Sequence, residues 1–206
     1  MRRYVFLILS TLFLNSFNLQ AQLLSKEELS QQKIFTSLED ALREPDKVYR
    51  LTLKRLKKID SLPEEIFLLK NLQELFVINS KLQTINKNIN QLFYLQYLNV
   101  DKNRLVKLPD ELTDLVHLKN LVICRNMIYK LPENIGIMTN LQEIIAWGND
   151  LYSLPESIIV LAESLQILDL RQISFRRSEI EKIESQLPKT KILYTNLCDC
   201  QSNRKL

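Results

Sequence analysis

Glycine is almost missing from this sequence, which has 2 glycines among 206 residues. That scarcity argues against glycine-rich phosphate-binding loops and favours a fold whose turns use Asn, Ser and Pro. Histidine is limited to His117, and no second histidine, cysteine or carboxylate stands at ligand spacing from it. We therefore expect no metal site, no cofactor and no histidine-activated nucleophile, and we expect His117 to be a solvated turn residue.

Cysteine is too scarce for a disulfide framework, because the chain has only Cys124, Cys198 and Cys200. Cys198 and Cys200 are separated by Asp199, whereas a redox pair normally has CxxC spacing beside a βαβ unit. We expect all three to be thiols without catalytic work, and we expect no enzyme. A thiol-based activity of the Cys-Asp-Cys tail stays open as the less favoured alternative.

One apolar run, residues 4–14, follows Arg2 and Arg3, and Ala21 offers a small residue for cleavage. This order predicts a secretory signal peptide over residues 1–21. Because the run is shorter than the roughly 20 residues of a bilayer span, we expect cleavage without stable membrane insertion, and a secreted, periplasmic or cell-surface protein. Loss of the two arginines would lower the formal net charge of +4 by two, which does not favour a nucleic-acid partner.

The rest of the chain is dominated by an internal repeat. Copies with a 23-residue period begin at Leu72, Leu95, Leu118 and Leu141 and read LQELFVINSKL, LQYLNVDKNRL, LKNLVICRNMI and LQEIIAWGNDL. A fifth copy, LQILDLRQISF, begins one residue late, and an earlier one, VYRLTLKRLKKI, begins near Val48. Between them stand segments such as KLPDELTDLVH and KLPENIGIMTN. Such self-similarity predicts an array of stacked units.

Each copy combines a strand pattern with a helix-like return. In LQYLNV, Leu98 and Val100 alternate with polar or aromatic neighbours, which predicts a short strand buried on one face. Parallel strands need long crossovers, and the LPxxIxxL segments supply them, with Pro109 suited to the first turn of a short helix. One copy cannot bury its own apolar face, so the copies must stack and share a core.

At these residues, roughly 48–194, the chain resembles the leucine-rich-repeat family with its LxxLxLxxNxL pattern, in the 23-residue subclass found in small exported bacterial proteins. The resemblance implies an α/β solenoid with a curved parallel sheet on the concave face, short helices on the convex face and a capping helix at each end. The expected organisation is a signal peptide (1–21), an N-terminal cap (22–47), repeats (48–175), a C-terminal cap (176–194) and a polar tail (195–206).

Two further features follow from the resemblance and from the pattern. Asn103, Asn126 and Asn149 occupy position nine, which in the family forms a buried ladder, because an Asn amide can pair with both N–H and C=O groups; Ser80 is a weaker substitute. For the caps, Thr36 with Glu39 and Ser178 with Glu181 are spaced as capping boxes. The segment KILYT predicts a last short strand after the second cap.

The candidate binding surface is the concave face, where positions three, five and seven of each strand should point outward. Apolar and aromatic residues are frequent there, and exposed apolar patches often mark interaction sites. The predicted binding residues are Phe76, Ile78, Tyr97, Val122, Arg125, Ile145 and Trp147. We expect a protein or peptide partner, with a cell-surface glycan stacked on Trp147 and Tyr97 as the alternative.

The signal peptide gives a direct test. We predict that the exported chain begins at Gln22, and N-terminal sequencing of exported protein measures this. An intact Met1 in membrane-bound material would contradict both export and cleavage.

Overall fold

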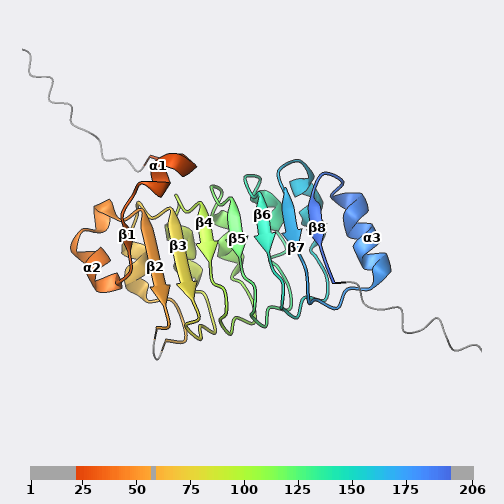
Figure 1. Cartoon of the computed structure of the whole chain (residues 1–206), viewed down its shortest axis with the longest axis horizontal. Helices are drawn as coiled ribbons and strands as arrows, with labels where there is room; N and C mark the ends of the chain where they lie inside the picture. The colour runs from red at the N-terminus through yellow and green to blue at the C-terminus, as the bar shows by residue number, and fades with distance from the viewer. Residues whose placement is uncertain (1–21, 57–58, 196–206) are drawn as a thin grey trace, which may run out of the picture.

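The structure, a computed structural model, describes residues 22–56 and 59–195. The predicted signal peptide, Cys198 and Cys200 lie outside these residues. Within the described parts of the chain, no helix is both long enough and apolar enough to cross a membrane. Eight parallel strands form one open sheet in sequence order (Figure 1). They are β1 (Ile34–Phe35), β2 (Arg50–Lys54), β3 (Glu74–Ile78), β4 (Tyr97–Asn99), β5 (Asn120–Val122), β6 (Glu143–Ile145), β7 (Ile167–Asp169) and β8 (Lys191–Leu193).

The returns between strands are short 3₁₀ helices that lie behind the sheet in the view of Figure 1. Pro109 is the N-cap of one of them, just before its first residue. They cover one face of the sheet, and we call the opposite face, which bears positions three, five and seven, the outer face. The 3₁₀ helices are η1 (Pro45–Lys47), η2 (Glu64–Leu68), η3 (Lys87–Gln91), η4 (Asp110–Asp114), η5 (Ile135–Ile137) and η6 (Glu156–Glu163).

The strand register confirms the 23-residue period, because each position of one copy pairs with the same position of the next. Leu75 pairs with Leu98, and Leu98 with Leu121. These position-four residues are at most 1% exposed, and Val100 at position six is fully buried. The predicted inward direction of positions four and six is therefore confirmed, and it places a continuous apolar core between the sheet and the 3₁₀ helices.

The turn after each strand contains a feature that the sequence pattern did not reveal. Position eight has a left-handed backbone in six successive copies, at Arg55, Asn79, Lys102, Arg125, Gly148 and Gln172. Only one of these is a glycine, although side-chain-bearing residues pay about 1–2 kcal/mol for this conformation. The conformation turns the chain so that position nine points back into the molecule.

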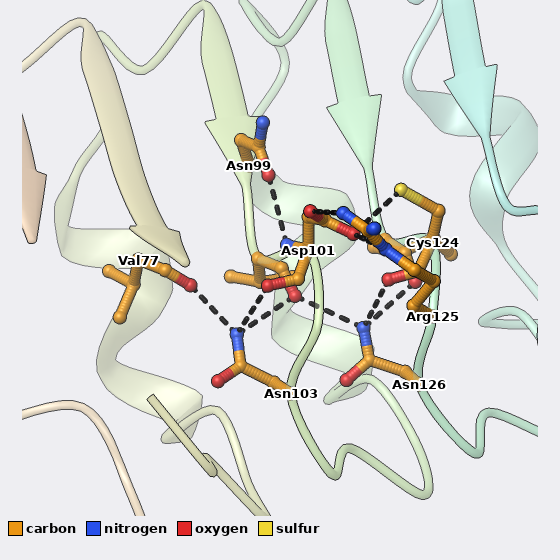
Figure 2. A network of polar contacts seen from close by, with 9 residues as sticks. Val77, Asn99, Asp101, Asn103, Cys124, Arg125 and Asn126 are labelled. Carbon is orange, nitrogen blue, oxygen red and sulfur yellow. Dashed lines mark hydrogen bonds and ion pairs between the residues drawn. The ribbon is translucent and has the colours of Figure 1, made fainter. Parts of the chain in front are cut away.

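Position nine is the buried asparagine ladder that the resemblance implied (Figure 2). The Asn103 amide donates to the carbonyls of Val77 (2.7 Å) and Val100 (2.9 Å), and its Oδ1 accepts from the backbone of Ser80 (2.9 Å) and Leu82 (3.1 Å). Each amide thus joins its own turn to the preceding copy. Asn126 and Asn149 repeat the arrangement, and the shorter Ser80 reaches only Ile78 and Leu56.

Helix α2 (Leu38–Arg43) lies at the end of the sheet beside β1, and α3 (Arg177–Gln186) lies at the other end beside β8, whereas α1 (Lys26–Ser30) lies above the starts of the first strands (Figure 1). Ala41 of α2, and Ile180 and Ile183 of α3, are buried in the core. The predicted last strand is confirmed as β8, which pairs with β7. The role of these helices as caps stays a prediction.

Both predicted capping boxes were misplaced. Ser37, not Thr36, is the N-cap of α2, and its hydroxyl accepts from the backbone of Asp40. In the C-terminal helix, the backbone N–H of Arg176 donates to the Glu179 carboxylate at 2.6 Å, so that helix begins before the Ser178 proposed as its cap. At both ends several polar residues are adjacent, and spacing alone could not choose among them.

The segment before α1 is tied to the strand starts by two buried glutamines at position two. Gln73, fully buried, accepts from the backbone N–H of Leu24 (2.9 Å) and donates to the carbonyl of Gln22 (2.7 Å). Gln96, 1% exposed, donates to the carbonyl of Leu24 (2.8 Å) and to Gln73 (2.7 Å). This contact joins residues up to 72 positions apart in the sequence.

The ladder predicts a stability effect. Asn126→Ala should lower the free energy of unfolding by about 1–3 kcal/mol, because the carbonyls of Val100 and Ile123 and the N–H of Leu105 lose their partner in the interior. Urea melts measure the change. The control is Asn134→Ala, since Asn134 is exposed and caps no helix with its side chain. Equal midpoints for the two variants would contradict the structural role of the ladder.

Candidate functional site

The outer face of β3 to β6 brings the predicted binding residues together. All six apolar and aromatic ones are partly exposed, and Arg125 is exposed. Phe76 and Ile78 lie in β3, Tyr97 begins β4, and Val122 and Ile145 end β5 and β6. Strand register places Phe76 beside Asn99 and Val122 beside Ile145. With adjacent strands about 4.8 Å apart, these side chains form one amphipathic surface.

Arg125 is held in this surface by contacts on two sides, and Figure 2 shows its contact with Asp101. Its Nε donates to Oδ1 of Asp101 at 2.8 Å, and its Nη2 contacts Oδ2 of the same carboxylate. The guanidinium also lies 5.1 Å from the centre of the Trp147 ring, within the range of a cation–π contact. Since Arg125 is anchored on both sides, its conformation is set before any partner arrives.

The carboxylate of Asp101 is held ionised by its neighbours. Burial by itself would raise its pKa, but hydrogen bonds from Arg125 and Cys124, together with the charge of Arg125, outweigh burial and lower the pKa below its usual value. The Asp101 backbone N–H also donates to Oδ1 of Asn99 at 2.9 Å. The Asp101 carboxylate therefore positions the Arg125 guanidinium.

Cys124 has an environment that suppresses thiol chemistry. Burial and the hydrogen bond from its Sγ to Oδ1 of Asp101 (3.0 Å), along with the negative charge of Asp101, raise the pKa of Cys124 to about 12. A thiol of this kind is protonated at neutral pH, whereas nucleophilic cysteines need a lowered pKa. The thiol thus serves as a hydrogen-bond donor within the site.

Some side chains at outward positions are buried, which the sequence analysis did not predict. Glu74 and Asp101 are 8% exposed and Asp169 is 2% exposed, because arginines cover them. Arg50 bridges Glu74 at 3.0 Å, and Arg171 contacts Asp169 at 2.6 Å. In two of these pairs the arginine and the acid are 24 residues apart. Arg50 and Glu74 occupy the same position of adjacent copies, and Arg125 stands one position beyond that of Asp101. Opposite charges at such neighbouring positions were the available signal.

Tyr97, at the start of β4, lies near acidic side chains at the starts of β3 and β6 and in α1. Burial raises the pKa of the Tyr97 phenol, and the charges of Glu74, Glu143 and Glu27 raise it further. Glu27 belongs to α1, so the N-terminal helix contributes to the same end of the outer face. Tyr97 is therefore un-ionised and available as a hydrogen-bond donor.

His117 lies away from this surface in an aromatic contact. Its ring meets Phe93 edge-on at 4.9 Å and stacks on Tyr94 at 6.2 Å. His117 lies in a turn, as expected, and is partly exposed. In the residues that the structure covers, no group of three or more His, Cys, Asp or Glu side chains could hold a metal ion.

Solved structures with a similar fold indicate the family of this chain. No family model matches the sequence, and no curated protein does. Among solved structures, a leucine-rich-repeat protein of Leptospira interrogans matches 79% of this chain with 31% identity and a TM-score of 0.60. The ectodomain of the Arabidopsis thaliana receptor kinase GASSHO1/SCHENGEN3, solved in complex with CASPARIAN STRIP INTEGRITY FACTOR 2, also matches 79%, with 20% identity and a TM-score of 0.58.

This chain spans 46% of the length of the Leptospira protein and 20% of the plant ectodomain. At 20% identity the second likeness is one of fold alone. The repeat register, the asparagine ladder and these neighbours agree, and the chain is a leucine-rich-repeat protein.

The Cys124 environment predicts low reactivity. In a Cys198→Ser/Cys200→Ser variant, Cys124 is the single thiol, and maleimide labelling of the folded protein should be negligible from pH 7 to 9, because the thiolate forms only near pH 12. The same variant unfolded in urea provides the control and should label fully. Rapid labelling of the folded form would contradict the buried, hydrogen-bonded geometry.

Proposed function

We propose that the chain is an exported interaction module that binds a protein or peptide through its outer face, which we expect to be concave, and that it catalyses no reaction. The proposal rests on the cluster of Arg125, Trp147 and Asp101 beside partly exposed apolar side chains. Aromatic residues and arginine are enriched at the cores of protein interfaces. The plant ectodomain, solved with its named partner, is an example of this fold in a complex.

The fixed arginine supports binding in energetic terms. Immobilising a flexible side chain at an interface costs about 0.5–1.5 kcal/mol, and for Arg125 the contacts with Asp101 and Trp147 meet that cost within the free protein. The guanidinium keeps N–H groups beyond those used by Asp101. A partner with carbonyl or carboxylate oxygens can accept from them, while its apolar side chains cover Val122 and Ile145.

The glycan alternative is less well supported by the same contacts. Sugar binding by stacking requires an open aromatic ring face, and one face of Trp147 is occupied by the Arg125 guanidinium. Tyr97 is partly buried and stands among acidic residues. An extended peptide can use the remaining ring surface and edges together with the arginine, so we favour a peptide or protein.

The test uses a partner obtained by affinity capture with the protein as bait, followed by titration of that partner. Trp147→Ala should weaken binding about 30-fold or more, equivalent to about 2 kcal/mol for an interface hot spot. Its stability should change much less than that of Leu121→Ala, which removes a fully buried side chain and should cost about 2–5 kcal/mol.

A matched control separates the outer face from general surface effects. Phe93→Ala removes an exposed aromatic residue outside the outer face and should leave the affinity unchanged. If the Trp147→Ala and Tyr97→Ala variants both keep full affinity while folded, the outer face is not the binding site.

A further inference from the structure

A second surface, separate from the outer face, runs along the loops that follow the strands, at the bottom of Figure 1. There the chain is extended, and successive copies are joined by backbone hydrogen bonds, such as Arg104 N to Leu82 O (2.7 Å) and Met127 N to Leu105 O (2.9 Å). Position eleven is buried, as at Leu105. Positions ten and twelve therefore project outward in regular rows. We call this surface the carboxyl edge; its residues are Lys81, Arg104, Val106, Met127, Tyr129 and Tyr152 at these two positions, together with Lys107 next to Val106.

The carboxyl edge carries uncompensated positive charge. Lys81, Arg104 and Lys107 are exposed and form no ion pair with any residue that the structure describes. Two acidic residues also lie along this edge: Asp150 at position ten, and Asp60, which is bonded to Gln83 of the next copy. Three of the 3₁₀ helices behind the sheet, η2, η4 and η6, are instead acidic, with Glu64, Glu65, Asp110, Glu111, Asp114, Glu156 and Glu163, whereas η3 carries Lys87. Charge is thus distributed unevenly, and the positive side coincides with the loop row.

The same edge exposes apolar and aromatic side chains next to the basic ones. Val106 is 45% exposed, Met127 44% and Tyr152 62%. Tyr152 stacks on Tyr129 with ring centres 6.2 Å apart and planes 11° apart. Tyrosine combines an apolar ring with a polar tip, which suits a boundary between water and an apolar phase.

We propose that the carboxyl edge docks on an anionic lipid surface, with the basic side chains on the headgroups and Val106, Met127 and Tyr152 at the acyl boundary. Lysine is depleted at protein interface cores, whereas lysine and arginine beside aromatic and aliphatic side chains are characteristic of interfacial membrane binding. Aliphatic side chains would contribute nothing to gripping a soluble polyanion. The acidic helices η2, η4 and η6 would face away from the surface, so one orientation is favoured.

Co-sedimentation with vesicles tests this inference. The full chain should bind vesicles of phosphatidylcholine with about 30% phosphatidylglycerol much more tightly than pure phosphatidylcholine, and added salt should weaken the binding. Each basic residue near such a surface contributes about fivefold in affinity. Lys81→Glu/Arg104→Glu should therefore weaken binding by about 25-fold or more, and Tyr152→Ser should weaken it independently of salt.

Matched variants keep the total charge and the apolar content equal. Lys87→Glu/Lys182→Glu makes the same charge change at exposed residues of η3 and α3, and Ile137→Ser removes an exposed apolar side chain of η5; both should bind as the unaltered chain does. Residues 1–21 are common to all variants, so their contribution cancels. Equal losses in the test and matched variants would overturn the proposal. Dextran sulfate, a soluble polyanion, gives a second decisive outcome. If it displaces the protein fully from the vesicles and binds the Tyr152→Ser variant as tightly as the unaltered chain, the carboxyl edge binds soluble polyanions and the proposal is overturned. Neither outcome depends on the partner of the outer face.

Discussion

The pairing of buried backbone groups at the turn after each strand is the constraint on which this structure depends. A strand of three to five residues that must return behind the sheet leaves carbonyl and N–H groups inside, where an unpaired group costs about 1–3 kcal/mol. The asparagine at position nine pairs with them in its own copy and in the preceding one. The left-handed backbone at position eight turns the asparagine inward. Arg55 and Lys102 adopt this conformation although it is unfavourable for residues with a side chain. The ladder thus fixes the spacing of the copies, and with it the positions of every outward column.

The outer face inherits its geometry from that register. Because each position repeats in the next strand, Asp101 and Arg125, one column apart in neighbouring copies, meet without any dedicated loop. Trp147 in the following copy then receives the guanidinium. A cluster of charged and aromatic side chains is therefore built from residues that are far apart in the sequence but adjacent in the array. The sheet beneath it holds it in place, and its residues come from the positions that the core does not use.

The repeat architecture and the ladder could be predicted from the sequence because both are periodic. Leu98 and Asn126 were placed correctly since burial and hydrogen bonding repeat every 23 residues. Features that depend on a single local choice could not be read in the same way. Ser37 was preferred over Thr36 as a helix cap by backbone geometry that spacing does not encode. The covering of Glu74 and Asp101 depended on where long arginine side chains lie, and the aromatic contacts of His117 depended on two copies meeting.

The glutamine pair at the strand starts has a consequence for how the molecule holds together. In a stacked array, contacts join each copy mainly to its neighbours, so a disturbance at one end need not be felt further along. Gln73 and Gln96 depart from that rule because their side chains, from two successive copies, both form hydrogen bonds with the backbone of Leu24. The beginning of the described chain is thereby bonded to the starts of the third and fourth strands. Because β1 and β2 lie between Leu24 and Gln73 in the sequence, their fraying with this contact in place would free a loop whose ends are tethered, which gains less conformational entropy than a free end does. Two amide side chains thus couple the stability of the segment before α1 to that of the third and fourth strands.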